Sequence, residues 1–170
     1  MMLRISKSVV LLASVLALGA CSKKAANSLE GNPNGIADSQ MAGNAVAGSE
    51  DDFKVNVGDR VYFVVDQSGL TGEGQDTLRK QAAWLAQYPD VAIQVEGHSD
   101  ERGTREYNIA LSARRATASR NFLIAQGVDA SRISTIAFGK ERPAELCDAE
   151  SCWSQNRRSV TVITGGAKTS

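Results

Sequence analysis

The sequence contains few of the residues that build catalytic, metal or nucleic-acid sites. Its 170 residues include one histidine and three cysteines, and aromatic residues make up only 5%. Nineteen basic and nineteen acidic side chains leave no net charge, and no basic patch or aromatic platform of a nucleic-acid-binding protein occurs. The Gly-x-Ser-x-Gly motif of many serine hydrolases is absent. We therefore expect a non-catalytic protein that uses no cofactor, metal or nucleic acid.

The longest apolar run, VVLLASVLAL at residues 9–18, is too short to cross a bilayer as a helix. A spanning helix needs about 20 apolar residues. Arg4 and Lys7 precede the run, acids are absent from it, and small residues follow it. This is the pattern of a secretory signal peptide, which we place at residues 1–20. The alternative, an N-terminal membrane anchor, is disfavoured by the length of the run.

A short motif follows the apolar run directly. Leu18-Gly19-Ala20-Cys21 resembles the bacterial lipobox, in which a signal peptidase cuts before a cysteine that then carries lipid. The resemblance implies acyl chains, typically palmitate, on Cys21, and each buried CH₂ adds about 0.8 kcal/mol of membrane affinity. Ser22 after the cysteine implies export to the outer membrane of a Gram-negative cell. We expect a lipid-anchored protein whose folded domain lies in the periplasm.

The segment after the lipobox has the composition of a tether. Residues 22–52 are rich in Gly, Ala, Asn and Ser and lack aromatic residues, so they bury too little apolar surface to offset the entropy of ordering. We assign residues 21–52 to the lipidated N-terminus and flexible tether. Residues 53–166 have the size of one domain, and residues 167–170 are expected to form a C-terminal tail.

The two other cysteines, Cys147 and Cys152, are close in sequence. In the oxidising periplasm such a pair is expected to form a disulfide that closes a small loop. The alternative is half of a zinc site. With His98 as the only histidine, the mature chain has too few nitrogen and sulfur ligands for a four-coordinate site.

Hydrophobic periodicity predicts alternating strands and helices in the domain. Val91, Ile93 and Val95 lie on one face of a strand, whereas Leu78 and Leu85 recur at helical spacing. Strands are expected at 59–66, 91–97, 132–139 and 157–164, and helices at 72–89 and 104–126. The order β-α-β-α-β-β predicts an α+β domain in which a mixed four-stranded sheet packs against two main helices.

The second helix is expected to bring an arginine near the end of the 91–97 strand. Arg114 and Arg115 lie at the two edges of its apolar stripe, and Asp100 follows the strand. Such an acid and arginine form either an internal ion pair or a receptor for a ligand that carries both an ammonium and a carboxylate. Open α/β sheets commonly bind ligands at strand ends. The stripe expected to face the sheet comprises Tyr107, Leu111, Ala118, Phe122 and Ala125.

The segment GHSDERGTREYNIALSARRA, residues 97–116, resembles the peptidoglycan-associating OmpA-like domain. In that family a Gly-x-x-Asp-x-x-Gly segment leads to Tyr-Asn, Leu-Ser and Arg-Ala. The match continues through VYFVVDQSGL, GVDASRISTIAFGKERPA and NRRSVTV, and it covers roughly residues 60–164. The chain departs from the commonest pattern at Val65, where the family often has an aromatic residue, and at the Cys147–Cys152 loop.

The resemblance implies that the domain binds peptidoglycan at the diaminopimelate of the stem peptide. By position, Asp100 would receive the ammonium of diaminopimelate, and Arg115, which the family pattern selects over Arg114, would bind its carboxylate. The other residues implied at the pocket are Asp66, Arg102 and Asn108.

The resemblance also implies TolB and other Tol proteins as partners in outer-membrane constriction during cell division. Three alternatives are a scaffold for envelope proteins, a stator-type wall anchor of a motor, and an enzyme acting on peptidoglycan. The intact Asp66, Asp100 and Arg115 argue against the scaffold, and the lipobox argues against the stator. His98, Ser99 and Asp100 are consecutive, and neighbouring side chains of extended backbone point to opposite faces, so they do not form a catalytic relay.

Overall fold

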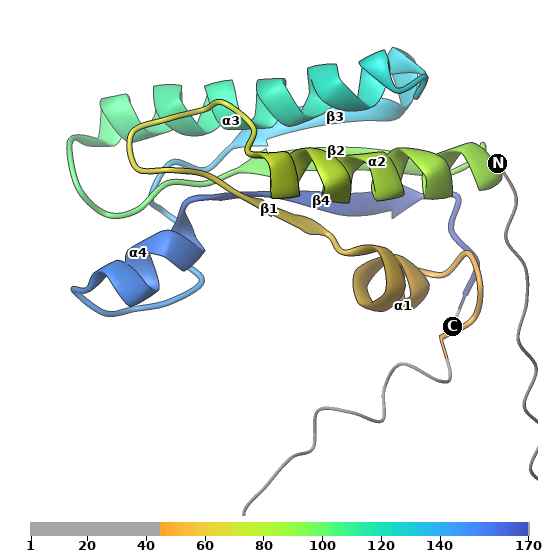
Figure 1. The fold of residues 1–170 in the computed structure, drawn as a ribbon, viewed down its shortest axis with the longest axis horizontal. Coiled ribbons are helices and arrows are strands. Elements are labelled where there is room, and N and C mark those ends of the chain that lie inside the picture. The colour runs from red at the N-terminus through yellow and green to blue at the C-terminus, as the bar shows by residue number, and fades with distance from the viewer. Residues whose placement is uncertain (1–44, 170) are drawn as a thin grey trace, which may run out of the picture. The chain divides into compact units, whose positions relative to one another are not determined.

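Four strands form one mixed sheet in residues 45–169, the part of the chain that the computed structural model describes (Figure 1). The strands are β1 Arg60–Tyr62, β2 Ala92–Gly97, β3 Ile133–Ala137 and β4 Arg158–Gly165. Their order in the sheet is β1-β4-β2-β3, with β2 parallel to β3 and β4 antiparallel to both β1 and β2. The expected α+β class with a mixed four-stranded sheet is confirmed.

Two long helices, α2 Gly72–Gln87 and α3 Arg105–Ala125, pack on the sheet (Figure 1). The hydroxyl of Thr71 accepts a hydrogen bond from Gly74 N, and that of Thr104 accepts one from Tyr107 N, so each helix begins at a threonine cap. Short helical elements that the periodicity does not predict are α1 Glu50–Asp52, a π-helical turn Phe53–Val57, a 3-10 turn Ala130–Arg132 and α4 Glu150–Asn156. They are too short for a periodic signal.

The hydrophobic core lies between the sheet and the two long helices. Val91, Ile93 and Val95 are at most 1% exposed, as the strand alternation predicts, and Leu78 and Leu85 of α2 are fully buried against them. Among residues 45–169, no helix is long and apolar enough to cross a membrane.

The face of α3 that packs on the sheet is largely polar, and the apolar stripe expected for this helix is only partly correct. Leu111 is buried and Phe122 packs partly buried against the core. Tyr107 and Ala125 are exposed. Polar groups can be buried when they are hydrogen-bonded, and the Ser119 hydroxyl lies 2.8 Å from the Ser159 hydroxyl of β4. Since hydrophobic periodicity cannot register such pairs, it misplaces the buried face. The buried residues of α3 are Asn108, Leu111, Ser112, Arg115, Ala116, Ser119 and Leu123.

Residues 45–52, expected in the tether, pack against the domain. The Asp52 carboxylate accepts hydrogen bonds from Trp84 Nε1 and Gly48 N, each at 2.8 Å. Ser49 is fully buried and forms a bridge with Lys168, a residue expected in the tail. A few polar contacts hold this segment against the domain. Its low apolar content gives no sign of these contacts in the sequence. The expected signal peptide, the lipidation at Cys21 and the remainder of the tether lie outside the described residues.

Candidate functional site

A cavity of about 470 Å³ opens between the loop after β1, the loop after β2 and the start of α3. All five residues that the sequence resemblance implies line it together: Asp66, Asp100, Arg102, Asn108 and Arg115. Val65, Gly103, Tyr107 and Leu111 complete its wall. Residues that are up to 49 positions apart in the chain, Asp66 and Arg115, thus meet in one pocket.

Asp66 reaches the pocket because β1 is shorter than predicted. The strand ends at Tyr62 rather than at 66, and the chain turns where Gln67 N donates to Val64 O at 3.2 Å. Asp66 adopts a positive φ of 59° within this turn, a conformation that aspartate tolerates better than most residues. Its carboxylate accepts a hydrogen bond from the Tyr107 hydroxyl of α3.

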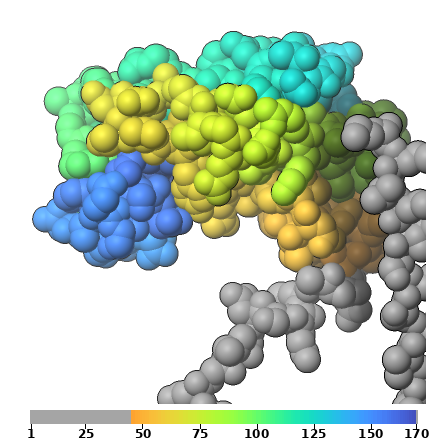
Figure 2. Space-filling view, in the orientation of Figure 1, coloured from red at the N-terminus to blue at the C-terminus, as the bar shows by residue number. Residues whose placement is uncertain are grey.

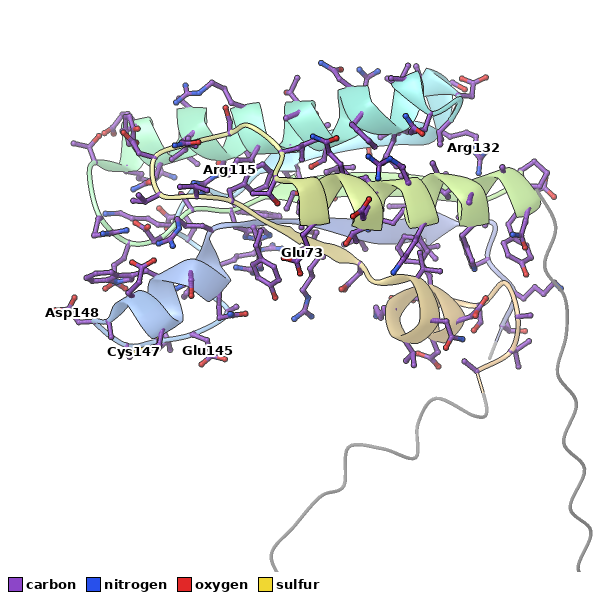
Figure 3. The ribbon with its side chains drawn as sticks, viewed as in Figure 1. Glu73, Arg115, Arg132, Glu145, Cys147 and Asp148 are labelled. Atoms are coloured by element: carbon purple, nitrogen blue, oxygen red, sulfur yellow. A yellow bond between two sulfur atoms is a disulfide. The ribbon has the colours of Figure 1, made fainter. Side chains whose placement is uncertain are left out.

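Arg115, labelled at α3 in Figure 3, is a fully buried side chain. Its hydrogen bonds go only to backbone carbonyls. Its Nε donates to Gln67 O at 2.9 Å, Nη1 to His98 O at 2.9 Å and Nη2 to Val64 O at 3.3 Å. No carboxylate of residues 45–169 lies within 4.0 Å of it. Burial lowers the pKa of Arg115 to about 10, so the guanidinium stays charged at neutral pH. Of its five N–H groups, two remain for a ligand.

Asp100 is paired with Arg102 and Arg157 and not with Arg115. Its Oδ1 accepts from Arg102 N and Nε, both at 3.2 Å, and its Oδ2 accepts from Arg102 Nη2 at 2.6 Å and Arg157 Nη1 at 3.3 Å. Burial by itself would raise the pKa of Asp100, but the hydrogen bonds from Arg102 and Arg157 outweigh it and hold the pKa below 3.8. The carboxylate is therefore ionised at neutral pH, and its roughly four acceptor positions are all occupied.

Side chains from outside the loop between Asp100 and α3 hold it by donating hydrogen bonds to its backbone carbonyls. Asn108 Nδ2 donates to Arg102 O at 2.8 Å. Lys140 Nζ donates to Glu101 O at 3.0 Å and to Gly103 O at 2.9 Å. These bonds fix the wall of the pocket from two sides of the loop.

Arg157 contacts the pocket residue Asp100, although it is not among the residues that the sequence resemblance implies. It is 5% exposed, and its Nε donates to Phe63 O at 3.2 Å. Its Nη1 reaches Asp100, and its Nη2 pairs with Glu150 of α4. The only sequence signal is the arginine pair at the start of β4.

Cys147 and Cys152 form a disulfide with a Cα–Cα distance of 5.7 Å (Figure 3). This distance lies within the usual range for disulfides, and the bond closes a loop before and into α4. Within the described ranges, no group of three or more metal-binding side chains occurs.

His98 lies behind the pocket as a buried neutral side chain. It is 1% exposed, its ring stacks on Phe138, and its Nε2 lies 3.3 Å from Glu96 Oε2, to which it donates. Burial, together with the positive charge of Arg158, lowers the pKa of His98 to about 4. The ring therefore serves as a structural donor at neutral pH, while its backbone carbonyl accepts from Arg115.

We expect the stability of the protein to fall as the pH drops from 7 to 4 because His98 is buried without charge. Its pKa is about 4 in the folded protein and 6.5 when exposed, so the unfolded chain takes up a proton first. The free energy of unfolding should decrease by about 3 kcal/mol over this window. Urea titrations of the wild type and His98→Gln test this. Since the chain has one histidine, an equal decrease in both proteins would contradict it.

Comparison with known proteins identifies the family. Residues 62–157 match the OmpA family model. The chain is 52% identical over 160 residues to the peptidoglycan-associated lipoprotein of Agrobacterium fabrum. This alignment covers 93% of this chain and 88% of the relative. The crystal structure of the peptidoglycan-associated lipoprotein from Burkholderia pseudomallei matches with a TM-score of 0.61 and 38% identity, over 62% of this chain and 90% of that one.

The fold also extends to more distant proteins. The C-terminal domain of Helicobacter pylori MotB matches with a TM-score of 0.60 at 21% identity, over 63% of this chain and 84% of that one. The family is one of structural, non-catalytic proteins, in agreement with the expectation from the sequence. The match of residues 62–157 to the family model and the identity to relatives over most of both chains place the chain in the OmpA family, among the peptidoglycan-associated lipoproteins.

Proposed function

We propose that this protein tethers the outer membrane to the cell wall by binding the diaminopimelate of peptidoglycan stem peptides without covalent bonds. The observation that carries the proposal is the Arg115 guanidinium, which is buried, charged and without a carboxylate partner in the described residues, and which retains two N–H groups beside an open cavity. A buried charge is costly unless it is paired. A ligand carboxylate supplies the missing partner in bidentate geometry.

The ammonium of the same ligand would be received by Asp100. Because the acceptor positions of Asp100 are occupied, the ammonium replaces part of the contact with Arg102. The Arg102 side chain is 41% exposed at the rim, so it can move without disturbing the core. Asp66 lines the same pocket from the loop after β1 and adds a second negative charge. The pocket thus offers opposite charges to the two ends of one amino-acid group.

The membrane end of the tether rests on the lipobox resemblance. Lipid on Cys21 would anchor the chain in the outer membrane, and the tether would let the domain reach the wall from the periplasm. The names of the relatives, which are lipoproteins associated with peptidoglycan, support both ends of this proposal. TolB and other Tol proteins are the partners that the family resemblance implies, with a role in envelope integrity and cell division through the Tol–Pal system.

Sedimentation with purified wall sacculi tests the wall-binding role. The mature chain, residues 21–170 in detergent, should sediment with sacculi, whereas Asp100→Ala should bind about 100-fold more weakly because a buried charged partner is lost. Asp148→Ala, an exposed acid near the disulfide, is the matched control and should bind as wild type does. Circular dichroism verifies folding. If Asp100→Ala is folded and sediments as wild type does, the pocket is not the wall site.

A further inference from the structure

Helix α4 lies beside the pocket and contacts the loop that carries Asp100 and Arg102. In the space-filling view, the segment that includes α4 is a blue lobe against the yellow segment after β1 (Figure 2). Trp153 Nε1 donates to Glu101 Oε1 at 3.0 Å, and the Trp153 ring lies 4.1 Å from Arg102 Cζ. Glu150, the first residue of α4, pairs with Arg157. No residue of α4 lines the pocket itself, but the loop that supplies Asp100 and Arg102 to the pocket is held from outside by this helix.

Arg102 lies between two carboxylates. Its Nη2 is 2.6 Å from Asp100 Oδ2 and 4.0 Å from Glu150 Oε2. The Trp153 ring provides a flat surface on which a guanidinium can shift while it keeps its cation–π contact. A small displacement along this ring would therefore transfer Arg102 from Asp100 to Glu150. The transfer would free acceptor positions on Asp100 without leaving the arginine unpaired.

Glu150 is held by its ion pair with Arg157 and lies in the loop that the disulfide closes. Helix α4 has seven residues, its N-cap residue Ala149 makes no side-chain cap, and Asn156 is its only buried residue. Isolated helices of this length are marginal in water. The C-terminal end of α4 is fixed by the Asn156 amide, which bonds Ala144 and Glu145. The N-terminal end is fixed by the Cys147–Cys152 disulfide, and Glu150 lies within the loop that this bond closes.

We propose that Glu150 is a positioning residue for wall binding: it accepts Arg102 when the ligand's ammonium takes Asp100, and the disulfide keeps it in place for this exchange. The inference rests on the proposed function, because it describes how the same pocket opens. Without Glu150, Arg102 stays on Asp100 and competes with the ammonium. Ligand affinity should therefore fall although Glu150 does not touch the ligand.

A double-mutant cycle tests the exchange. The probe is a stem tripeptide that ends in diaminopimelate, titrated calorimetrically into the mature chain in detergent. Glu150→Gln should raise the Kd about tenfold, the size of a lost charge-assisted hydrogen bond, and Cys147→Ser/Cys152→Ser should raise it about threefold. In an Arg102→Ala background, Glu150→Gln should change the Kd less than twofold, because the competitor for Asp100 is gone.

The outcomes separate the inference from the function on which it rests. If wild type does not bind the tripeptide, the proposed function itself fails. If wild type binds and Glu150→Gln binds equally well, the exchange is overturned. It is also overturned if Glu150→Gln changes the Kd by the same factor with and without Arg102. The change would then result from the lost pair between Glu150 and Arg157. Leu146→Ala, an 84% exposed residue of the same loop, is the control and should bind as wild type does.

Discussion

Replacement of Arg115 by methionine is expected to abolish detectable wall binding and to destabilise the fold. The change removes the cation that would bind the ligand carboxylate, and it leaves the carbonyls of Gln67 and His98 without their donor, whereas Val64 O keeps its bond from Gln67 N. We expect the Kd for the diaminopimelate tripeptide to rise at least about 100-fold. The free energy of unfolding should decrease by about 2 kcal/mol, roughly 1 kcal/mol for each of the two unsatisfied carbonyls.

Arg115→Lys separates binding from stability. Lysine keeps the positive charge but presents three donors from one nitrogen, so it cannot serve three separate carbonyls and a carboxylate together. This variant should be destabilised less than Arg115→Met and should still bind the tripeptide poorly. Arg114→Met, the neighbouring exposed arginine on α3, is the control and should change neither property. Calorimetry and urea titration measure both quantities. Wild-type affinity in folded Arg115→Lys would contradict a guanidinium-specific receptor.

The receptor also predicts how the variants treat a related ligand. A tripeptide with lysine at its third position offers the ammonium without the carboxylate. Wild type should prefer the diaminopimelate peptide strongly, whereas Arg115→Met should bind both peptides with similar weak affinity. A preference that survives the loss of Arg115 would assign the carboxylate to another donor.

The strands and the two long helices could be predicted because local patterns encode them. Alternation at Val91, Ile93 and Val95 produces a strand wherever one face of a sheet is buried, and these residues are buried. Threonine caps and the glycine after α3 mark helix ends in the sequence itself, and Gly127 has the expected positive φ of 97°. These features depend only on neighbours within a few residues, so they can be predicted from the sequence.

The network around Asp100 could not be predicted because its members are distant in the chain. The resemblance indicates Asp100 and Arg115, but nothing local indicates that Arg157 and α4 approach them. The bond between Arg157 and Asp100 spans 57 positions, and that between Trp153 and Glu101 spans 52. The register of β4 beside β2 creates both contacts. Charge pairing of this kind is decided by the sheet order, which periodicity does not specify.

The buried face of α3 shows a second limit. Arg115 and Asn108 are among its least exposed residues, although both are polar. A helix whose buried face carries hydrogen-bonded functional groups has a weak hydrophobic pattern, and the pattern then favours the wrong stripe. The failure of the periodicity therefore coincides with the wall of the candidate pocket, as expected where function and not packing sets the side chains.

The contact between α3 and β2 leads to the second large prediction. A Cβ atom added at Gly97 would lie 1.9 Å from Ser112 O and 2.7 Å from Ser112 C, both in the backbone of α3. Helix α3 therefore approaches β2 so closely that only glycine fits at the end of the strand. Gly97→Ala should lower the free energy of unfolding by about 3 kcal/mol or more, because the helix must move away from the sheet.

The same displacement should weaken ligand binding. His98 follows Gly97, and its carbonyl accepts from Arg115 on the helix that would move. Gly97→Ala should therefore raise the Kd of whatever protein remains folded, measured at low temperature where the variant is most populated. Gly165→Ala in β4 is the matched control, since an added Cβ there meets nothing within 4 Å. If Gly97→Ala is as stable as Gly165→Ala, the close approach of α3 does not set the distance between the helix and the sheet, and Arg115 must be held at the pocket by its carbonyl contacts alone.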